Sequence, residues 1–336
     1  MRNKNQLPVI TALVLLASFS LIFTACLLGG DIETIRATAA DGRSVVVPGE
    51  NLAEKLSWLE DYAWDGGNFI VEVNADEIIS PHFFNYDPGE SNNVTITMKG
   101  ISANRKISIS SNGSFIVGKR VTLILDNNIT LLGRDDNDKP LVEVSSGGTL
   151  IMNTGSAITG NNNKASTSYS YDGDAYYGGG VFVSNYDGTN WRNNSVMPRG
   201  REFTGGTFIM NGGTISGNTG SGGGGVCSIG TFTMSGGTIS GNTTTTNGGG
   251  VYVERRMGST FIGGTFTKTG GTIYGYSESD PVNSNVVKNH DYGVVNNRGH
   301  AVFANGKRKE TTAGPGVDLS FDGSVDPPTF SGEWDY

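Results

Sequence analysis

Two stretches of this sequence hold side chains that could carry acid–base chemistry on the repeats. One runs from Asp172 to Glu202 and the other from Glu254 to Arg256, and both contain acidic and basic residues. Glycoside hydrolases use two carboxyl groups held roughly 5 to 9.5 Å apart. The stretch between them, residues 205–253, contains no Asp, Glu, Lys, Arg or His, so it cannot perform general acid–base catalysis. We therefore predict no catalytic residues, with a glycan-cleaving enzyme as the alternative.

Motifs that often bind cofactors or metals are weak here. Gly220 to Gly225 satisfies the pattern G-x-G-x-x-G, but no strand–helix–strand unit that binds dinucleotides surrounds it. Asp135 to Asp138 begins like a calcium loop, but its glycine is missing and Ser146 replaces the bidentate glutamate. The histidines at positions 82, 290 and 300 are widely scattered. We predict no cofactor and no metal site.

Aromatic side chains that could bind a ligand are concentrated in two predicted insertions, near residues 162–177 and 184–204. Insertions into a repeat array emerge on its surface, where rings can stack on sugars or peptides. The candidate ligand-binding residues are Tyr169, Tyr171, Tyr176, Tyr177, Tyr186 and Trp191. Charged residues accompany them at Asp172, Asp174, Arg192 and Arg199. The alternative is that these rings only pack long loops onto the body of the protein.

A regular repeat supplies the body that must carry these insertions. Residues 205–218 read GGTFIMNGGTISGN, and residues 230–242 read GTFTMSGGTISGN, so that equivalent residues lie 24 apart. An earlier copy spans 147–161 and a decayed one spans 264–276. A third element, GGGVYV at residues 248–253, recurs between copies. Glycine is also about twice as frequent as in ordinary proteins, with 51 in 336 residues. Each unit therefore holds three short strands joined by tight turns.

The alternation within each strand indicates how the units pack. In residues 231–234, Phe232 and Met234 share one face while the threonines take the other. A coil of chain buries these faces by stacking Phe208 on Phe232, unit upon unit. Asn161, Asn218 and Asn242 recur at one turn, where their amides can form an internal ladder. The sequence predicts an all-β fold, a right-handed single-stranded parallel β-helix with triangular rungs of three strands.

The GGTISGN units resemble those of pectin-lyase-like parallel β-helix proteins. This group includes polymorphic outer-membrane proteins and adhesins of bacteria, and the units look especially like those of glycine-rich β-helix lipoproteins of spirochaetes. The resemblance is clear over roughly residues 90 to 304. It implies the fold strongly and the function weakly, since the same coil carries enzymes and adhesins.

The N-terminal segment has the pattern of an export signal. Arg2 and Lys4 precede an apolar run that ends at Phe23, and Cys26 follows. This cysteine resembles the one in the bacterial lipobox, whose thiol is acylated, although Phe23 stands where leucine is usual. We predict a signal peptide at 1–25, a lipid on Cys26 that anchors the chain in the membrane, and a flexible tether at 26–43. The alternative is an uncleaved membrane anchor with an incidental cysteine. Cys227 has no predicted disulfide partner.

The two ends of the coil need covers, because open strand edges promote aggregation. We predict an N-terminal cap at 44–90 that contains a helix at 51–63 and a first strand at 69–73. The coil is expected to span 91–304, with a third insertion near 276–297. The tail at 305–336 is expected to close the far end, with Trp334 as a plug. Lys268 replaces a buried methionine of earlier copies, which indicates that the apolar column ends there.

The net charge of −8 argues against a nucleic-acid partner, because phosphate binding needs a basic surface. We therefore predict a lipoprotein of the outer membrane or cell surface with a structural or adhesion-type binding role. The alternative is a β-helix polysaccharide lyase or glycoside hydrolase. A glycan or a host or envelope protein is the expected ligand, and the sequence leaves the oligomeric state open.

Overall fold

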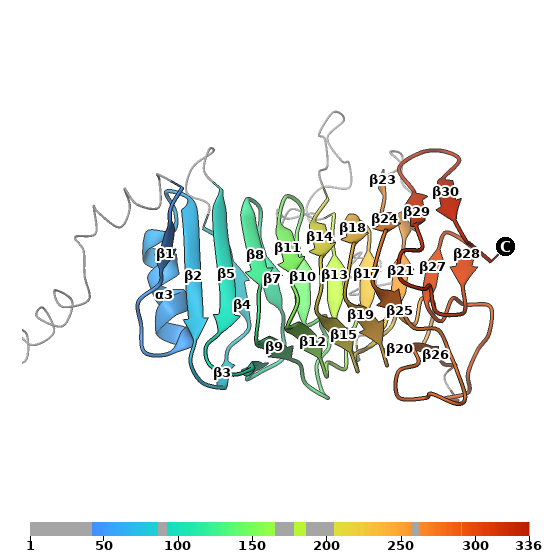
Figure 1. The fold of residues 1–336 in the computed structure, drawn as a ribbon, viewed down its shortest axis with the longest axis horizontal. Coiled ribbons are helices and arrows are strands. Elements are labelled where there is room, and N and C mark those ends of the chain that lie inside the picture. The colour runs from blue at the N-terminus through green and yellow to red at the C-terminus, as the bar shows by residue number, and fades with distance from the viewer. Residues whose placement is uncertain are drawn as a thin grey trace, which may run out of the picture.

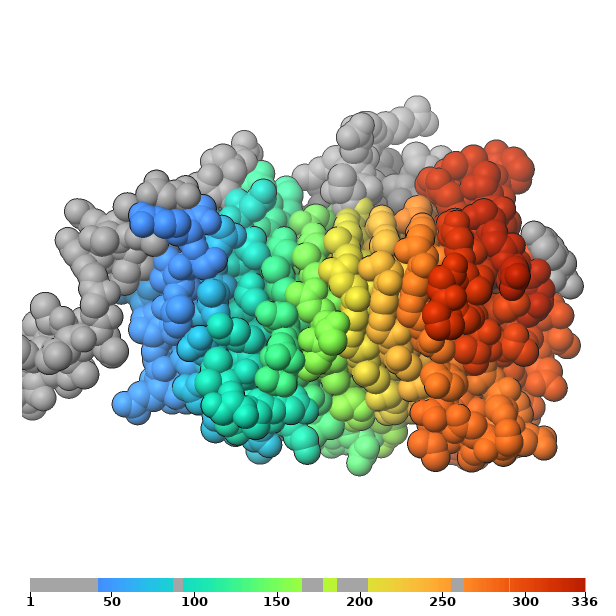
Figure 2. Space-filling view, viewed as in Figure 1, coloured from blue at the N-terminus to red at the C-terminus, as the bar shows by residue number. Residues whose placement is uncertain are grey.

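A computed structural model describes residues 42–86, 93–164, 178–185, 205–256, 262–289 and 291–335. The described chain has one helix and many short strands, most of which pair in parallel. The strands follow one another along the long axis of the molecule (Figure 1), and successive coils form successive bands in the space-filling view (Figure 2). The fold is the all-β parallel β-helix that the repeat predicts.

Three sheets, which are parallel except at their C-terminal ends, form the walls of the coil. Sheet A runs β1 (Ser44–Val46), β2 (Gly67–Val73), β5 (Val94–Gly100), β8 (Val121–Leu125), β11 (Thr149–Met152), β14 (Thr207–Met210), β18 (Thr231–Met234), β24 (Thr265–Lys268), β29 (Leu319–Asp322) and β30 (Thr329–Gly332). Sheet B runs β3 (Glu77–Ile79), β6 (Arg105–Ile109), β9 (Ile129–Leu132), β12 (Ser156–Thr159), β15 (Thr214–Ser216), β19 (Thr238–Ser240) and β25 (Thr272–Ile273). Sheet C runs β4 (His82–Phe84), β7 (Phe115–Val117), β10 (Val142–Val144), β13 (Val181–Val183), β17 (Val226–Ser228), β21 (Val251–Val253), β27 (Val302–Ala304) and β28 (Lys307–Lys309).

Within the described residues, the chain passes from sheet A to B to C seven times, which makes seven rungs. A small fourth sheet at the corner between B and C holds β16 (Thr219–Gly220), β20 (Thr243–Thr244) and β26 (Val286–Val287). A two-stranded ribbon joins β22 (Arg255–Arg256) to β23 (Ile262–Gly263). Three short walls per rung leave room inside for one layer of side chains from each sheet.

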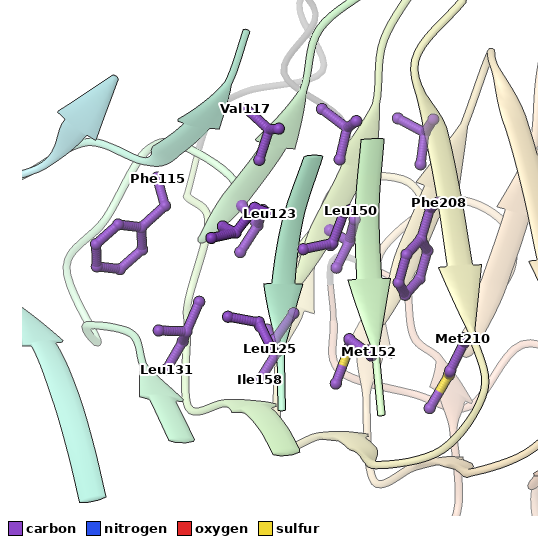
Figure 3. Close-up of a cluster of buried hydrophobic side chains, with 14 of the residues drawn as sticks. Phe115, Val117, Leu123, Leu125, Leu131, Leu150, Met152, Ile158, Phe208 and Met210 are labelled. Atoms are coloured by element: carbon purple, nitrogen blue, oxygen red, sulfur yellow. The ribbon is translucent and has the colours of Figure 1, made fainter. Parts of the chain in front are cut away.

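The predicted stacking of equivalent side chains is confirmed. Phe208 pairs with Phe232 and Phe232 with Phe266, and the ring centroids lie 4.8 and 5.1 Å apart. All three rings are fully buried. Figure 3 shows the earlier part of this column, where Leu123 and Leu150 precede Phe208. Each stacked aromatic pair contributes about 0.5 to 1.5 kcal/mol beyond the burial of its area.

The length of a turn of the coil varies, in part as predicted. Met210 pairs with Met234, 24 residues on, as the repeat predicts. Met152 pairs with Met210, 58 residues on, which agrees with two predicted insertions in this interval. Met234 pairs with Lys268, 34 residues on, and this longer turn was not predicted. Strand pairing fixes only the strands, so the connections between them can lengthen without a change of register.

A ladder of buried asparagines follows the corner between sheets B and C. The backbone N–H groups of Asn161, Asn218 and Asn242 each donate to the side-chain oxygen of the next ladder asparagine, at 3.0 to 3.1 Å. Two members are added to the predicted three. Asn137 donates its amide to Asn161 at 2.9 Å, and Asn285 accepts from Asn242. The predicted ladder is confirmed and is longer than expected.

Helix α3 (Leu52–Tyr62) covers the N-terminal end of the coil. Asn51 caps it by accepting the Glu54 N–H, and the Glu54 carboxylate accepts the Glu50 N–H in return. The carboxylate of Glu77, from β3, accepts the Leu52 N–H and ties the start of the helix to the first rung. Buried leucines on one face close the core beneath it.

The coil begins earlier than residue 91, the predicted start. β2, β3 and β4 pair in parallel with β5, β6 and β7 along all three sheets, so residues 67–84 form the first complete rung. These strands were predicted to belong to the cap because they lack the glycine-rich motif of the later repeats. Strand β1 and helix α3 are what remains of the predicted cap.

The C-terminal end is covered by strands that reverse direction. β28 pairs antiparallel with β27, and β29 pairs antiparallel with β24. Trp334 is buried against Phe330. The amine of Lys268 is buried here too and donates to the Gly314 carbonyl at 2.7 Å; burial lowers its pKa. Only part of the predicted segment 276–297 is an insertion, because β26 lies within it and extends the fourth sheet.

Candidate functional site

The predicted site residues lie outside the described part of the chain. This holds for Cys26 and for the six aromatic candidates Tyr169, Tyr171, Tyr176, Tyr177, Tyr186 and Trp191. It also holds for the charged residues from Asp172 to Glu202. Among the described residues, no helix has the length and hydropathy needed to cross a membrane. What the structure does describe is the coil from which the two insertions leave.

Both insertions are attached at the two ends of strand β13. The Asn163 amide donates to the Gly178 carbonyl at 2.9 Å, which closes the base of the first insertion. The Gly206 N–H donates to the Ser184 carbonyl at 2.7 Å, which closes the base of the second. One insertion therefore enters sheet C and the other leaves it, so that they flank the same strand.

The outer face of sheet C carries one side chain per rung. Strand alternation sends the flanking residues of each three-residue strand into the core and the middle residue outward. Paired in register, the outward column is Phe83, Ile116, Glu143, Phe182, Cys227, Tyr252 and Phe303. Six of these seven side chains are apolar or aromatic. The alternation within each strand can be predicted from the sequence. The alignment of these residues across rungs cannot, because it depends on the exact lengths of the insertions.

The middle of this column is a second hydrophobic cluster, separate from the core. Phe182, Cys227 and Ile229 are buried although they point away from the interior, and Tyr252 packs against them. The Tyr252 and Phe303 rings lie 5.9 Å apart. Burial, and secondarily Glu254, raise the pKa of the Cys227 thiol well above its usual range. A protonated, enclosed thiol is unsuited to nucleophilic chemistry.

An open hollow of about 230 Å³ lies at the N-terminal end of the same face. It is lined by Pro81, His82, Phe83, Gly113, Ser114, Ile116, Lys139 and Glu143. Phe83 is 48% exposed, and Glu143 is the one carboxylate in the lining. The pair of carboxyl groups that glycoside hydrolysis requires is therefore not assembled in this hollow.

The imidazole of His82 sits beneath this hollow in a largely buried position. Its Nδ1 lies 3.9 Å from Glu60 and its Nε2 lies 3.4 Å from the Tyr86 hydroxyl. Burial lowers the pKa of His82, and the carboxylate of Glu60 partly offsets this. Burial, followed by Glu60, also raises the pKa of Tyr86. Both groups are thereby held neutral at physiological pH.

The weak motifs of the sequence have structural roles. Asp136 pairs with Arg134 at 2.7 Å, and the neighbouring Asn137 belongs to the ladder, so the acidic run is a solvated turn. In the described ranges, no group of three His, Cys, Asp or Glu side chains could hold a metal ion. Gly223 has a φ of +67°, and a Cβ at Gly224 would lie 2.5 Å from the Gly249 carbonyl oxygen. The glycines of G-x-G-x-x-G therefore serve rung packing.

No family model, curated protein or solved structure matches this chain. The outward column of sheet C is largely aromatic or apolar, with Phe83 exposed at one end and Phe182 and Cys227 buried in the middle.

Proposed function

We propose that this chain is a lipid-anchored protein of the bacterial envelope whose coil presents the outer face of sheet C, with its two insertions, to a binding partner. The observation that carries the proposal is the attachment of both insertions at the ends of β13. Two aromatic-rich segments are thereby joined to the two ends of one strand, whose sheet has a largely apolar outward column. Paired aromatic and apolar surface is typical of binding sites for proteins and glycans.

The proposal also includes membership of this β-helix in the pectin-lyase-like group. Three sheets per rung and an asparagine ladder at one corner support it. The anchor is supported by the sequence alone, through the apolar run and the cysteine that follows it.

Two experiments test the proposal separately. Metabolic labelling with a radioactive fatty acid should label the chain, and Cys26→Ser should abolish the label while export continues. Continued labelling of that variant contradicts the anchor.

For the binding face, the wild-type chain and a chain lacking residues 186–204 are compared on immobilised host-matrix proteins and a glycan array. The shortened loop keeps the Ser184–Gly206 stem intact. A ligand bound only by the complete chain supports the proposal. Equal binding by both chains contradicts the role of this insertion, and release of new reducing ends from a glycan favours the hydrolase instead.

A further inference from the structure

Asparagine followed by glycine is the pair of residues most prone to deamidation. The backbone nitrogen of the second residue attacks the side-chain amide carbon of the asparagine, and glycine, which has no Cβ, hinders this attack least. The sequence contains four such pairs, which are Asn112–Gly113, Asn211–Gly212, Asn247–Gly248 and Asn305–Gly306. All four lie in the described ranges, so the surroundings of the reacting groups can be compared.

In three of the pairs the attacking nitrogen is bound within the coil. The N–H groups of Gly212 and Gly248 donate to carbonyls of neighbouring turns of the coil, at 3.1 and 2.9 Å. The Gly113 N–H donates to the side-chain oxygen of Asn137, a member of the buried ladder, at 3.0 Å. Each nitrogen must give up this bond before it can turn toward the asparagine side chain, and the loss of such a bond is unfavourable.

The asparagine side chains of the same three pairs are bound as well. The Asn112 oxygen accepts the Asp138 N–H at 2.9 Å, and the Asn247 oxygen accepts from the Arg298 guanidinium at 3.5 Å. The Asn211 side chain bonds to side chains of neighbouring rungs at 3.2 and 3.3 Å. Space is also short, because a Cβ on any of the three glycines would lie 2.3 to 2.6 Å from its nearest atom.

The fourth pair differs in all three respects. Asn305 and Gly306 form the exposed two-residue turn between β27 and β28, with φ values of +42° and +81° that are typical of a tight hairpin. Within the described residues, neither the Asn305 side chain nor the Gly306 N–H has a hydrogen-bond partner. A Cβ on Gly306 would meet no atom within 4 Å. Both reacting groups are therefore free to approach each other in water.

We propose that Asn305 is the site at which this protein deamidates. The Gly306 nitrogen forms a bond to Cγ of Asn305 and gives up its proton, while the bond from Cγ to the amide nitrogen breaks and ammonia leaves with that proton. Water then opens the five-membered imide ring. Opening on one side leaves aspartate, and opening on the other leaves isoaspartate, in which the backbone runs through the former side chain. The net change is the gain of one water and the loss of one ammonia, so no oxidant or cofactor is required.

The position of this turn gives the modification a structural consequence. The turn joins β27 to β28, the strand that covers the C-terminal end of sheet C (Figure 1). Isoaspartate adds a backbone carbon to a turn that places Ala304 opposite Lys307, and either product puts a negative charge beside the basic strand β28. The modification thus changes the charge and the length of a turn at the end of the coil. The inference goes beyond the proposed function and requires neither the lipid anchor nor a ligand.

Peptide mapping of aged protein tests this assignment. Residues 27–336, which keep the coil and both of its covers, are incubated at mildly alkaline pH and digested at acidic pH, and mass spectrometry follows each Asn–Gly peptide. Asn305 should convert at least about tenfold faster than each of the other three asparagines, because those must first lose hydrogen bonds. A parallel sample in concentrated urea gives the rates without the fold, and there all four should convert at similar rates.

A pair of variants provides the matched control. Asn305→Gln should remove most of the acidic forms that ion exchange separates from the aged chain, because glutamine must close a larger ring that forms slowly. Asn211→Gln, at a position that is also exposed but hydrogen-bonded, should leave their accumulation unchanged. Conversion at Asn112, Asn211 or Asn247 that matches or exceeds that at Asn305 in the folded chain would overturn the proposal. An equal advantage of Asn305 in urea would overturn it too, because the fold would then not be its cause.

Discussion

Removing one asparagine of the buried ladder should destabilise the coil far more than removing an equivalent exposed asparagine. Asn242 is fully buried, and its side-chain oxygen accepts the backbone and amide N–H groups of Asn218 at 3.0 and 3.1 Å. Its own amide donates to the carbonyls of Ile215 and Ser240 at 3.0 Å. Asn242→Ala therefore leaves a buried backbone N–H of Asn218 without an acceptor.

The expected loss follows from these bonds. An unsatisfied buried donor costs about 1 to 3 kcal/mol, and each lost bond to a carbonyl costs about 1 kcal/mol. We expect Asn242→Ala to lower the free energy of unfolding by about 3 to 5 kcal/mol. Asn211 is the control, because it is exposed and its side chain bonds to the side chains of Asn153 and Ser235 in neighbouring rungs. Asn211→Ala should cost less than about 0.5 kcal/mol.

Urea unfolding of residues 27–336, followed by circular dichroism, measures both variants against the parent chain. If Asn242→Ala and Asn211→Ala are destabilised to within about 1 kcal/mol of each other, the ladder does not support the corner of the coil as argued here.

Three further predictions follow from buried groups. Cys227 is the one cysteine of residues 27–336, and its buried, protonated thiol should react with a disulfide reagent at pH 8 only after unfolding; rapid labelling of the folded chain contradicts its placement. Burial lowers the pKa of His300, and Glu310 partly opposes this effect. The His300 Nδ1 accepts the Val287 N–H. The His300 imidazole therefore takes up a proton more readily in the unfolded chain than in the folded one. Stability should be full above the ordinary histidine pKa near 6.5 and fall as the pH drops to 5.5; His300→Gln should reduce that slope, and an unchanged slope refutes the assignment. Gly224→Ala should lower the free energy of unfolding by at least about 3 kcal/mol, because its Cβ would meet backbone atoms. Gly306→Ala is the control: its Cβ would have open space but its φ is +81°, so it should cost about 1 kcal/mol. Equal losses in the two variants contradict the close packing of rungs.

The repeat carried enough information to predict the coil, because three properties coincide in it. Phe232 and Met234 alternate with threonines, glycines mark the turns, and the asparagines recur with the same period. Asn137 could have been included, since it lies 24 residues before Asn161, but it stands within the acidic run Asp135 to Asp138 and outside the GGTISGN copies. Asn285 lies 43 residues after Asn242, and only the fold reveals that these two are neighbours.

Other features had no local signal. The first rung, residues 67–84, uses larger apolar residues and few glycines, so it does not resemble the later copies. The hollow depends on how distant turns are placed around the corner between sheets B and C. The antiparallel strands at the C-terminal end cover open edges, but the need for such a cover does not specify which strands pair.

The central claim is that equivalent residues of successive copies lie side by side, and cross-linking tests it most directly. In residues 27–336 with Cys227→Ser, cysteines replace Thr207 and Thr231, which are paired neighbours on sheet A. Adjacent strands lie about 4.8 Å apart, within the range of Cα separations that a disulfide spans. The coil predicts rapid bridging of this pair under mild oxidation and none between cysteines at 207 and 265, which are two strands apart. Equal bridging of both pairs, or none at 207 and 231, would contradict it.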